Sequence, residues 1–514
     1  MQARINKFRN IKPLVKFENK ILLIGVGIVG RSILPLVFKL IDIHPSQFTI
    51  IDMEDHRKSI RHYLKMGVKF IHKKITEQNY KTVLGSLLSE GDILLDLAYD
   101  IDTLCLLEYC HSNGIRFLNT SVEEWDPFDS THKTPKQLTL YHRNEKIKKA
   151  VNKWEDHGVS GSTAILDCGA NPGNVSCLVK QGMVDISRKI LRNPKVSIER
   201  KKRIRRYIHN NYFNLLAREI GLKVVHISER DTQIINDPKK EGEFCNTWSP
   251  AGFIEESYAT SEVGFGVHEK KLPENGKKHD SGSKNQIFLT EHAMNKQMRS
   301  YIHSGPIIGM LIRHGEAYSI SDRLTVHKED IPNPRSYIHD PLRHQIPMSK
   351  KLHSITSHYV YLPCDAGLAS IHEYRMNGYK MQPKVRRLFN EIIDGRDELG
   401  GLLCWDGGLW WTGSKLDIHE TRKMIDHTKN DINATSLQVG GSFIAALIYA
   451  IRHPSIGVCF TDDLDYAEYL SISNMFWGPM YSEEIKLPKE EFDKIKDFQF
   501  SQFEAKEKIN LEQK

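Results

Sequence analysis

The sequence lacks the short motifs that mark several common enzyme classes. It has no HExxH helix of a zinc protease, no GxSxG turn of a serine hydrolase and no Walker P-loop. Its 24 histidines show no spacing typical of zinc ligands, so we expect no bound metal. These absences exclude the best-marked hydrolases and nucleoside triphosphatases.

Paired cysteines and long apolar runs are also missing. The eight cysteines are scattered without a CxxC pair, which is typical of reduced thiols in a cytoplasmic protein. The first ten residues are basic but lack the apolar core of a signal peptide. The apolar run 442–451 is too short to cross a bilayer and predicts a buried helix. We therefore expect a cytoplasmic protein without membrane contact.

The sequence also lacks a strong excess of charge of one sign. The formal net charge of +8 arises from 72 basic and 64 acidic residues, which indicates a mixed surface. The densest basic run, 188–206, is more typical of a solvated helix face than of a nucleic-acid patch. No aromatic-interleaved RNA-binding motif is present, so we expect no nucleic-acid partner.

What the sequence does contain is a glycine-rich turn in the context of a nucleotide-binding fold. Four apolar residues, 21–24, predict a buried strand, and the turn Gly25-Val-Gly27-Ile28-Val29-Gly30 then opens a helix. The three glycines would make the turn, admit a pyrophosphate and let the helix pack on the strand. The pattern predicts a dinucleotide site at the helix N-terminus.

Asp52 indicates which dinucleotide is bound. It ends the second predicted strand, 47–51, where a carboxylate can accept hydrogen bonds from the adenosine ribose hydroxyls. The same charge repels a 2′-phosphate. We therefore predict NAD rather than NADP as the cofactor.

The order of short apolar strands and helices predicts an α/β fold. Six strands alternate with helices, which is the pattern of a Rossmann doubly wound parallel sheet. The predicted strands are 21–24, 47–51, 68–72, 92–97, 115–119 and 163–167. We expect residues 15–175 to form the NAD-binding domain, 176–435 an α+β domain for substrate binding and dimerisation, and 453–514 a C-terminal segment, with a late helix near 436–452 packing back on the first domain.

Two features of the sequence indicate a site next to this sheet. Asn171 lies in an Asn-Pro-Gly turn after the sixth predicted strand, at the edge where parallel sheets place ligands, although it fits a helix-capping turn equally well. Carboxylates at Glu229, Glu255 and Glu256 flank Trp248 in the second domain. Because an indole face attracts ammonium groups, this combination suits a cationic ligand.

Five stretches together resemble the bacterial homospermidine synthase family, which is related in fold to saccharopine dehydrogenase. They are the glycine turn and the stretches 119–125, 168–176, 246–250 and 313–319. The similarity extends from about residue 15 to about residue 480.

This resemblance implies roles for individual residues. It implies catalytic roles for Glu229, Glu256, His314, Glu316 and Asn171. It implies substrate binding by Trp248, Glu123 and Asp96, with Trp248 as the cation–π platform. It implies cofactor binding by Gly25, Gly27, Ile28, Val29, Gly30, Asp52, Thr120 and Asn171. A further carboxylate of the family falls on either Asp394 or Asp397.

The resemblance also implies the reaction. A homodimer would use NAD to turn two putrescines into homospermidine and ammonia through imine intermediates, with NAD regenerated and no net redox change. Putrescine is the implied partner, and spermidine and other diamines are further candidates. Two other interpretations stay open: a saccharopine- or carboxyspermidine-type dehydrogenase, and a non-catalytic NAD-binding regulator.

Overall fold

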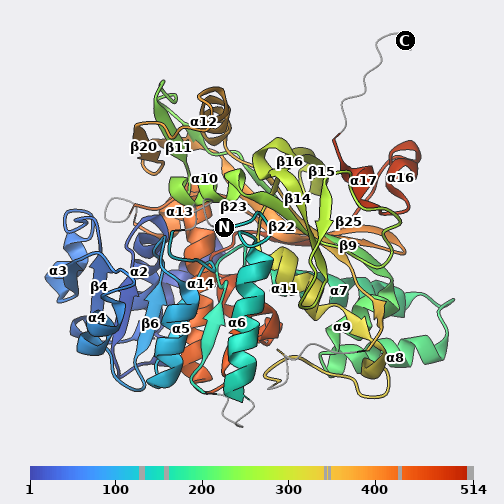
Figure 1. Cartoon of the computed structure of the whole chain (residues 1–514), viewed down its shortest axis with the longest axis horizontal. Coiled ribbons are helices and arrows are strands. Elements are labelled where there is room, and N and C mark those ends of the chain that lie inside the picture. Colours follow the sequence, from blue (N-terminus) through green and yellow to red (C-terminus); the bar gives the residue numbers. More distant parts are fainter. Residues whose placement is uncertain (127–132, 156–160, 341–343, 345–348, 427–430, 506–514) are drawn as a thin grey trace.

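The computed structural model describes residues 1–514 apart from 127–132, 156–160, 341–343, 345–348, 427–430 and 506–514. Two sheet-based units lie side by side (Figure 1). One is built mainly from the N-terminal third of the chain. The other is built around a large mixed sheet from the middle of the chain.

The first unit contains a seven-stranded parallel sheet, as the α/β pattern predicted. Its order is β24-β8-β7-β6-β2-β4-β5. The strands are β2 (Ile21–Ile24), β4 (Phe48–Asp52), β5 (Lys69–His72), β6 (Ile93–Asp96), β7 (Arg116–Asn119), β8 (Ala164–Leu166) and β24 (Val458–Phe460). All six predicted strands are present. β24 falls in the stretch assigned to the C-terminal segment, and it pairs in parallel with β8.

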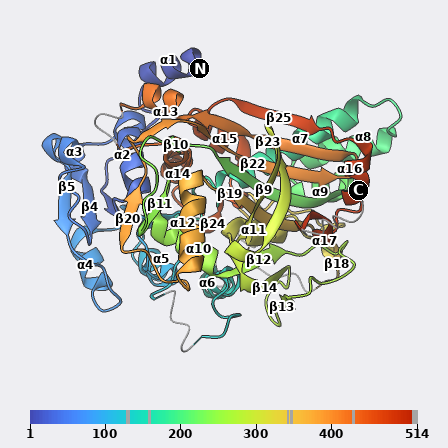
Figure 2. The ribbon, with the colours of Figure 1, turned by 90° about the horizontal axis from the view of Figure 1, so that it is seen from above.

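Helices cover this sheet. They are α2 (Ile28–Leu40), α3 (Arg61–Met66), α4 (Tyr80–Leu87), α5 (Thr103–Ser112), α6 (Leu140–Glu155), α14 (Ala434–Arg452) and α15 (Tyr466–Ser473). Nearby, the short strands β1 (Val15–Lys16) and β3 (Ile41–Asp42) pair in parallel. The N-terminal helix α1 (Gln2–Asn10) packs against α13 (Ile418–Met424), as Figure 2 shows.

The late helix α14 packs against α2. A Cβ at Gly440 would lie 2.5 Å from the Ser32 Oγ, so glycine is needed for this close approach. At 19 residues α14 is longer than the predicted run, and by length and composition alone it could cross a membrane. However, 89% of its apolar window is buried inside the molecule, which confirms a buried helix.

The second unit is an α+β structure built on a ten-stranded mixed sheet. Its main path is β13-β14-β12-β19-β9-β22-β23-β25, and β16 joins β15 to β19. The strands are β9 (Leu222–Asp231), β12 (Thr260–Gly264), β13 (Gly276–Lys278), β14 (Gln286–His292), β15 (Gln297–Ile302), β16 (Gly305–Ile312), β19 (Thr356–Leu362), β22 (Arg396–Trp405), β23 (Gly408–Asp417) and β25 (Met480–Ile485).

The remaining elements surround this sheet. The helices are α7 (Asn174–Arg192), α8 (Ile198–His209), α9 (Phe213–Ile220), α10 (Pro250–Tyr258), α11 (Gly315–Arg323), α12 (Asp365–Met376), α16 (Lys489–Ile495) and α17 (Phe500–Phe503). Three strand pairs complete the unit: β10 (Ile234–Ile235) with β21 (Ile392–Asp394), β11 (Glu243–Asn246) with β20 (Lys384–Arg387), and β17 (Val326–His327) with β18 (Lys351–His353). Helix α7 packs on β22 and β23 and also contacts α15, so it joins the two units.

Candidate active site

The glycine turn between β2 and α2 has the geometry of a phosphate-binding loop. Gly25 has a φ of +86°, and a Cβ there would lie 2.7 Å from the Leu97 carbonyl carbon, so only glycine fits this turn. A Cβ at Gly30 would lie 2.4 Å from the Gly25 oxygen. A Cβ at Gly27 would meet nothing within 4 Å, and no side chain caps the first turn of α2. The helix N-terminus is therefore open toward an anion.

Asp52 ends β4 directly beside this turn. Its carboxylate accepts hydrogen bonds from the backbone nitrogens of Val26 at 2.7 Å and Glu54 at 2.8 Å. Asp52 thus fixes the glycine turn to the end of the neighbouring strand. Carboxylate oxygens have several lone pairs, so both can still accept a hydrogen bond from a hydroxyl group.

A cavity of about 150 Å³ lies between the two units, at the carboxyl ends of the parallel strands. Both units contribute to its lining. The lining residues are Val29, Leu97, Ala98, Tyr99, Thr120, Ser121, Glu123, Gly169, Asn171, Pro172, Glu229, Trp248, Ser249, Gly252, Glu255, Glu256, His314, Tyr359, Thr435 and Val439. The cavity therefore joins one end of the predicted nucleotide site to the predicted substrate residues.

Glu229 on β9 is a buried carboxylate with fixed partners. Its Oε2 atom accepts hydrogen bonds from Asn171 Nδ2 at 2.9 Å and from the Tyr359 hydroxyl at 2.7 Å. Burial raises the pKa of Glu229 to about 7, while these two hydrogen bonds favour the ionised form. Glu229 can therefore exchange a proton near neutral pH.

His314 lines the same cavity as Glu229 and is uncharged. It precedes α11, and its ring packs against Tyr359 with the ring centres 4.7 Å apart. Burial lowers the pKa of His314 to about 3. A neutral imidazole at this position does not repel a cationic substrate.

Trp248 and Glu256 form another part of the cavity wall. The Trp248 indole nitrogen donates a hydrogen bond to the Tyr361 hydroxyl at 3.0 Å, which fixes the ring. Glu256 on α10 is half-buried, and burial followed by the nearby Glu255 charge raises its pKa well above the usual range. Among the described residues, no side chain donates a hydrogen bond to the Glu256 carboxyl group. This pairing of an aromatic ring with a carboxyl group suits an ammonium ligand.

Glu123 and Glu255 lie at the inner end of the cavity. Glu123 Oε1 accepts a hydrogen bond from Ser121 Oγ at 2.8 Å, and burial raises the pKa of Glu123 to about 7. Burial also acts to raise the pKa of Glu255, but Arg313 and Arg143 outweigh this effect, so its pKa is lowered. Glu255 is therefore a permanently ionised member of this group.

Two of the predicted catalytic and substrate-binding residues, Glu316 and Asp96, do not line the cavity. Glu316 Oε1 accepts hydrogen bonds from the backbone nitrogens of Gly173 at 2.8 Å and Ser176 at 3.1 Å, which places Glu316 behind His314 as a support for the Asn171 loop. Asp96 is buried at the end of β6, and burial raises its pKa to about 8. The two alternatives for the last carboxylate differ in burial, and neither of them lines the cavity. Asp394 has a side chain 69% exposed, whereas Asp397 is fully buried and accepts a hydrogen bond from Thr435.

The structure adds cavity residues that sequence reasoning missed. Tyr359 lies on β19, and nothing in the sequence around it indicates that its hydroxyl reaches Glu229. Thr435 and Val439 arrive from α14, whose return to the first unit was predicted without its site contacts. Only the long-range packing of α14 could have identified these residues.

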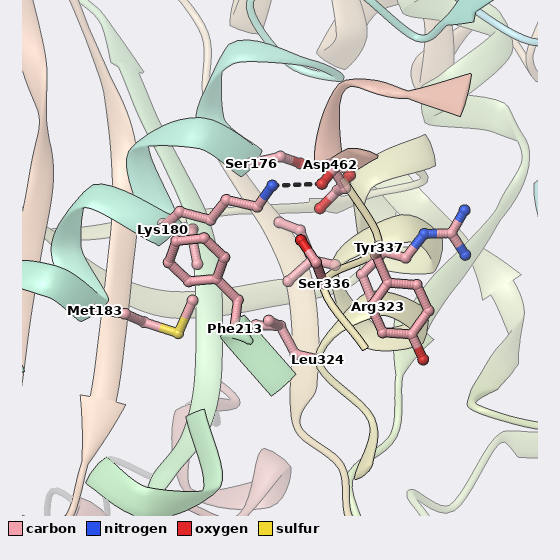
Figure 3. A pocket seen from close by; sticks show the side chains of 11 residues that line it. Ser176, Lys180, Met183, Phe213, Arg323, Leu324, Ser336, Tyr337 and Asp462 are labelled. Carbon is pink, nitrogen blue, oxygen red and sulfur yellow. Dashed lines mark hydrogen bonds between the residues drawn. The ribbon is translucent and has the colours of Figure 1, made fainter. Parts of the chain in front are cut away.

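A second, much smaller pocket is lined by Ser176, Lys180 and Asp462, among other residues (Figure 3). It has room for about one water molecule. Lys180 donates a hydrogen bond to the Asp462 backbone oxygen there, so the lysine charge is directed away from the main cavity. None of the predicted site residues lines this pocket.

The saccharopine dehydrogenase family matches the chain in two parts. The saccharopine dehydrogenase NADP binding domain matches residues 21–161, and the saccharopine dehydrogenase C-terminal domain matches residues 169–478. Together with the glycine turn and the adjoining cavity, these matches define a dinucleotide-binding enzyme of the saccharopine dehydrogenase class.

Individual relatives identify the family within this class. A homospermidine synthase of Mesorhizobium japonicum is 32% identical over 90% of this chain and 89% of the relative, and one of Blastochloris viridis is 32% identical over 90% and 91%. The crystal structure of the Legionella pneumophila homospermidine synthase in complex with NAD superimposes with a TM-score of 0.80, covering 97% of this chain and 100% of that chain at 32% identity. The chain belongs to the homospermidine synthase family.

Proposed function

We propose that this chain is an NAD-dependent homospermidine synthase, which joins two putrescine molecules into homospermidine and ammonia without net oxidation. One observation carries the proposal. A single cavity places Val29 and Thr120 of the nucleotide unit opposite Trp248, Glu229 and Glu256. A dication and a dinucleotide could therefore meet in the same enclosed space.

The residues present fit NAD. The open N-terminus of α2 would hold the pyrophosphate, Asp52 would hold the adenosine ribose, and Val29, Thr120 and Asn171 would lie toward the nicotinamide. When bound, NAD takes a hydride from the carbon that bears an amine and returns it after the amines have exchanged. We propose that the nucleotide unit combines residues 15–175 with α14 and β24, because both elements pack on it.

The side chains of the cavity supply binding and proton transfer. The Trp248 ring and the Glu256 carboxyl group would bind substrate ammonium groups. The Glu229 carboxylate would accept a proton from an ammonium nitrogen and release the lone pair of that nitrogen, while Asn171 and Tyr359 hold the carboxylate in place. The closed cavity would keep water away from the carbon–nitrogen double bond, which water would otherwise hydrolyse.

The arginines next to the inner end of the cavity argue against a carboxylated substrate. A saccharopine- or carboxyspermidine-type enzyme needs a free arginine for the substrate carboxylate. Arg143 and Arg313 both reach the inner wall, but each is paired with Glu255. A diamine without a carboxylate therefore fits the described residues better.

A product assay tests the proposed function. Purified protein would be incubated with putrescine and NAD, with polyamines separated by chromatography and NADH followed by absorbance. We expect homospermidine and ammonia without accumulation of NADH. Accumulating NADH would indicate an ordinary amine dehydrogenase, and the absence of any product would favour the carboxylated-substrate enzyme or the regulator.

Asp52→Ala should raise the Kd for NAD. The substitution removes a carboxylate that fixes the glycine turn and that would bind the ribose, and a hydrogen bond to a charged group contributes about 1.5–3 kcal/mol. We expect a loss of affinity of about 10- to 100-fold by calorimetry. Asp55→Ala is the matched control, because Asp55 is exposed and pairs with Arg57. An unchanged Kd for Asp52→Ala would mean that other residues hold the ribose.

We also propose that the protein is a cytoplasmic homodimer. No disulfide bond joins any of the eight cysteines in the part of the chain that the structure describes, which supports a reducing compartment. Exposed apolar side chains on and near β10, α12, β20 and β21 support an interface: Ile234, Met376, Met381, Val385 and Ile393. Figure 1 shows β20, β11 and α12 together on one side of the molecule.

Val385→Lys should convert the dimer into monomers. Val385 is 49% exposed, and a buried lysine at an interface would be unpaired. Light scattering after gel filtration measures the mass. Ile198→Lys is the control, because Ile198 is 67% exposed and belongs to α8, which lies far from β20 in Figure 1. A variant that stays dimeric would place the interface elsewhere.

A further inference from the structure

Two buried arginines converge on one carboxylate at the inner end of the cavity. Arg143 Nη2 lies 3.2 Å from Glu255 Oε1, and Arg313 Nη2 donates a hydrogen bond to the same oxygen. Both arginine side chains are 2% exposed, and that of Glu255 is 7% exposed. This arrangement is a carboxylate-binding site whose carboxylate belongs to the protein itself.

The arginines are held in place without Glu255. Arg143 Nη1 donates a hydrogen bond to the Val122 backbone oxygen at 2.9 Å, and Arg313 Nη1 donates one to the Leu138 backbone oxygen at 2.9 Å. Because the main chain anchors each guanidinium from another direction, the pair would keep its geometry if the Glu255 carboxylate were removed.

Glu255 also separates the arginines from the main cavity. It lines the main cavity, which neither arginine lines, and it lines a smaller adjoining cavity of about 20 Å³, which both arginines line. Glu123, Glu256 and His314 line both cavities. Shortening the Glu255 side chain would therefore open the arginine pair to a molecule bound beside Glu123 and Glu256.

The charges at this wall decide which amines can enter. A carboxylated amine in the intact cavity meets the ionised carboxylate of Glu255, while the two guanidinium groups are already occupied. Like charges in a dry cavity repel strongly. A diamine without a carboxylate meets only groups that attract its ammonium ends.

From this geometry we propose that Glu255 determines substrate specificity: it fills an arginine-lined anion site from within and so excludes diamines that carry a carboxylate on a terminal carbon. The proposal rests on the proposed function, because it concerns the choice between substrates of that reaction. Glu255 is thus a specificity residue, in addition to its structural ion pairs.

Glu255→Ala tests the proposal with ornithine, which is putrescine with a carboxylate on one terminal carbon. Binding of each amine to the NAD-loaded protein would be followed by calorimetry. We expect the ratio of ornithine affinity to putrescine affinity to rise by about 100-fold, because a repulsive group is removed and a paired cation site is opened. Added acetate should compete with ornithine in the variant and leave the wild type unaffected.

Glu124→Ala is the matched control. Glu124 Oε2 lies 3.8 Å from Arg143 Nε, but its main partners are Lys133 and Lys146, and it does not line either cavity. Glu124→Ala therefore removes the same charge near the same arginine without opening the cavity. Its ornithine-to-putrescine ratio should equal that of the wild type.

The outcomes separate this inference from the proposed function. Wild-type protein that forms no homospermidine contradicts the proposed function, whatever its affinities. An active wild type that binds ornithine as tightly as putrescine overturns the specificity role of Glu255, and this result needs no variant. Equal ratios for Glu255→Ala and wild type also overturn it. If Glu255→Ala does not fold, Glu255→Gln removes the charge at constant size and should still raise the ratio; an unchanged ratio there overturns the proposal.

Discussion

Glu229→Gln is expected to lower kcat for homospermidine formation by about 1,000-fold. The amide keeps the shape of the carboxyl group and can still contact Asn171 and Tyr359, but it cannot accept a proton from the substrate. General-base catalysis by a positioned side chain contributes about 100- to 10,000-fold. The measurement is a chromatographic rate assay at saturating putrescine. A variant with more than a tenth of the wild-type rate would assign the base elsewhere.

The pH dependence of the wild type gives an independent signature. Burial raises the pKa of Glu229 to about 7, and the group acts as a base only when ionised. The rate should therefore increase as the pH rises through about 7, and Glu229→Gln should lose this limb. A variant that keeps the limb would show that another group produces it.

Thermal unfolding provides the control for Glu229→Gln. The pKa of Glu229 is higher in the folded protein than in the unfolded chain. The free energy of unfolding therefore decreases as the pH rises above the pKa of the unfolded chain, and the decrease is complete above about pH 7. A neutral glutamine avoids this decrease. The variant should therefore be at least as stable as the wild type at pH 8, and a lower Tm would indicate structural damage as the cause of inactivity.

Trp248→Ala should lower kcat/KM for putrescine by about 30-fold, which corresponds to a cation–π contribution of about 2 kcal/mol in a desolvated site. The Kd for NAD should not change, because the ring belongs to the substrate unit. Trp248→Phe keeps a weaker aromatic face, so its kcat/KM should lie between that of the wild type and that of Trp248→Ala. Steady-state rates and calorimetry measure these effects.

Trp410→Ala is the matched control for this substitution. Trp410 lies on β23 and bonds to Ser482, outside the cavity. It should keep the wild-type kcat/KM. A Trp248→Ala variant that works at the full rate would contradict the cation–π role.

Much of the fold follows from local sequence. The strand before Gly25 and the spacing of the three glycines are sufficient for the nucleotide turn, because this motif depends on contiguous residues. The strand ending at Asp52 follows from the same kind of pattern. The second unit was predicted only as an α+β domain without a strand order, since the order of its large sheet depends on pairings between distant strands, such as β9 with β22.

The candidate site was predictable to a lesser degree. Trp248 and the carboxylates around it could be selected by residue type and resemblance. The pairing of Arg143 with Glu255 could not be predicted, because 112 residues separate them and each residue, taken alone, is typical of a solvated surface. Glu316 has the residue type of a catalytic acid, yet the structure gives it backbone partners. Residue type predicts chemistry, whereas three-dimensional contacts decide whether that chemistry faces the cavity.

The edge strand β24 has a consequence for how the chain is made. Its partner β8 ends at Leu166, but β24 starts only at Val458, so the ribosome must synthesise most of the second unit, all of its large sheet except β25, before the first sheet receives its last strand. Pairings between such distant segments form slowly. The nascent nucleotide unit therefore exposes an unpaired edge through most of translation, when chaperone binding would protect it from aggregation.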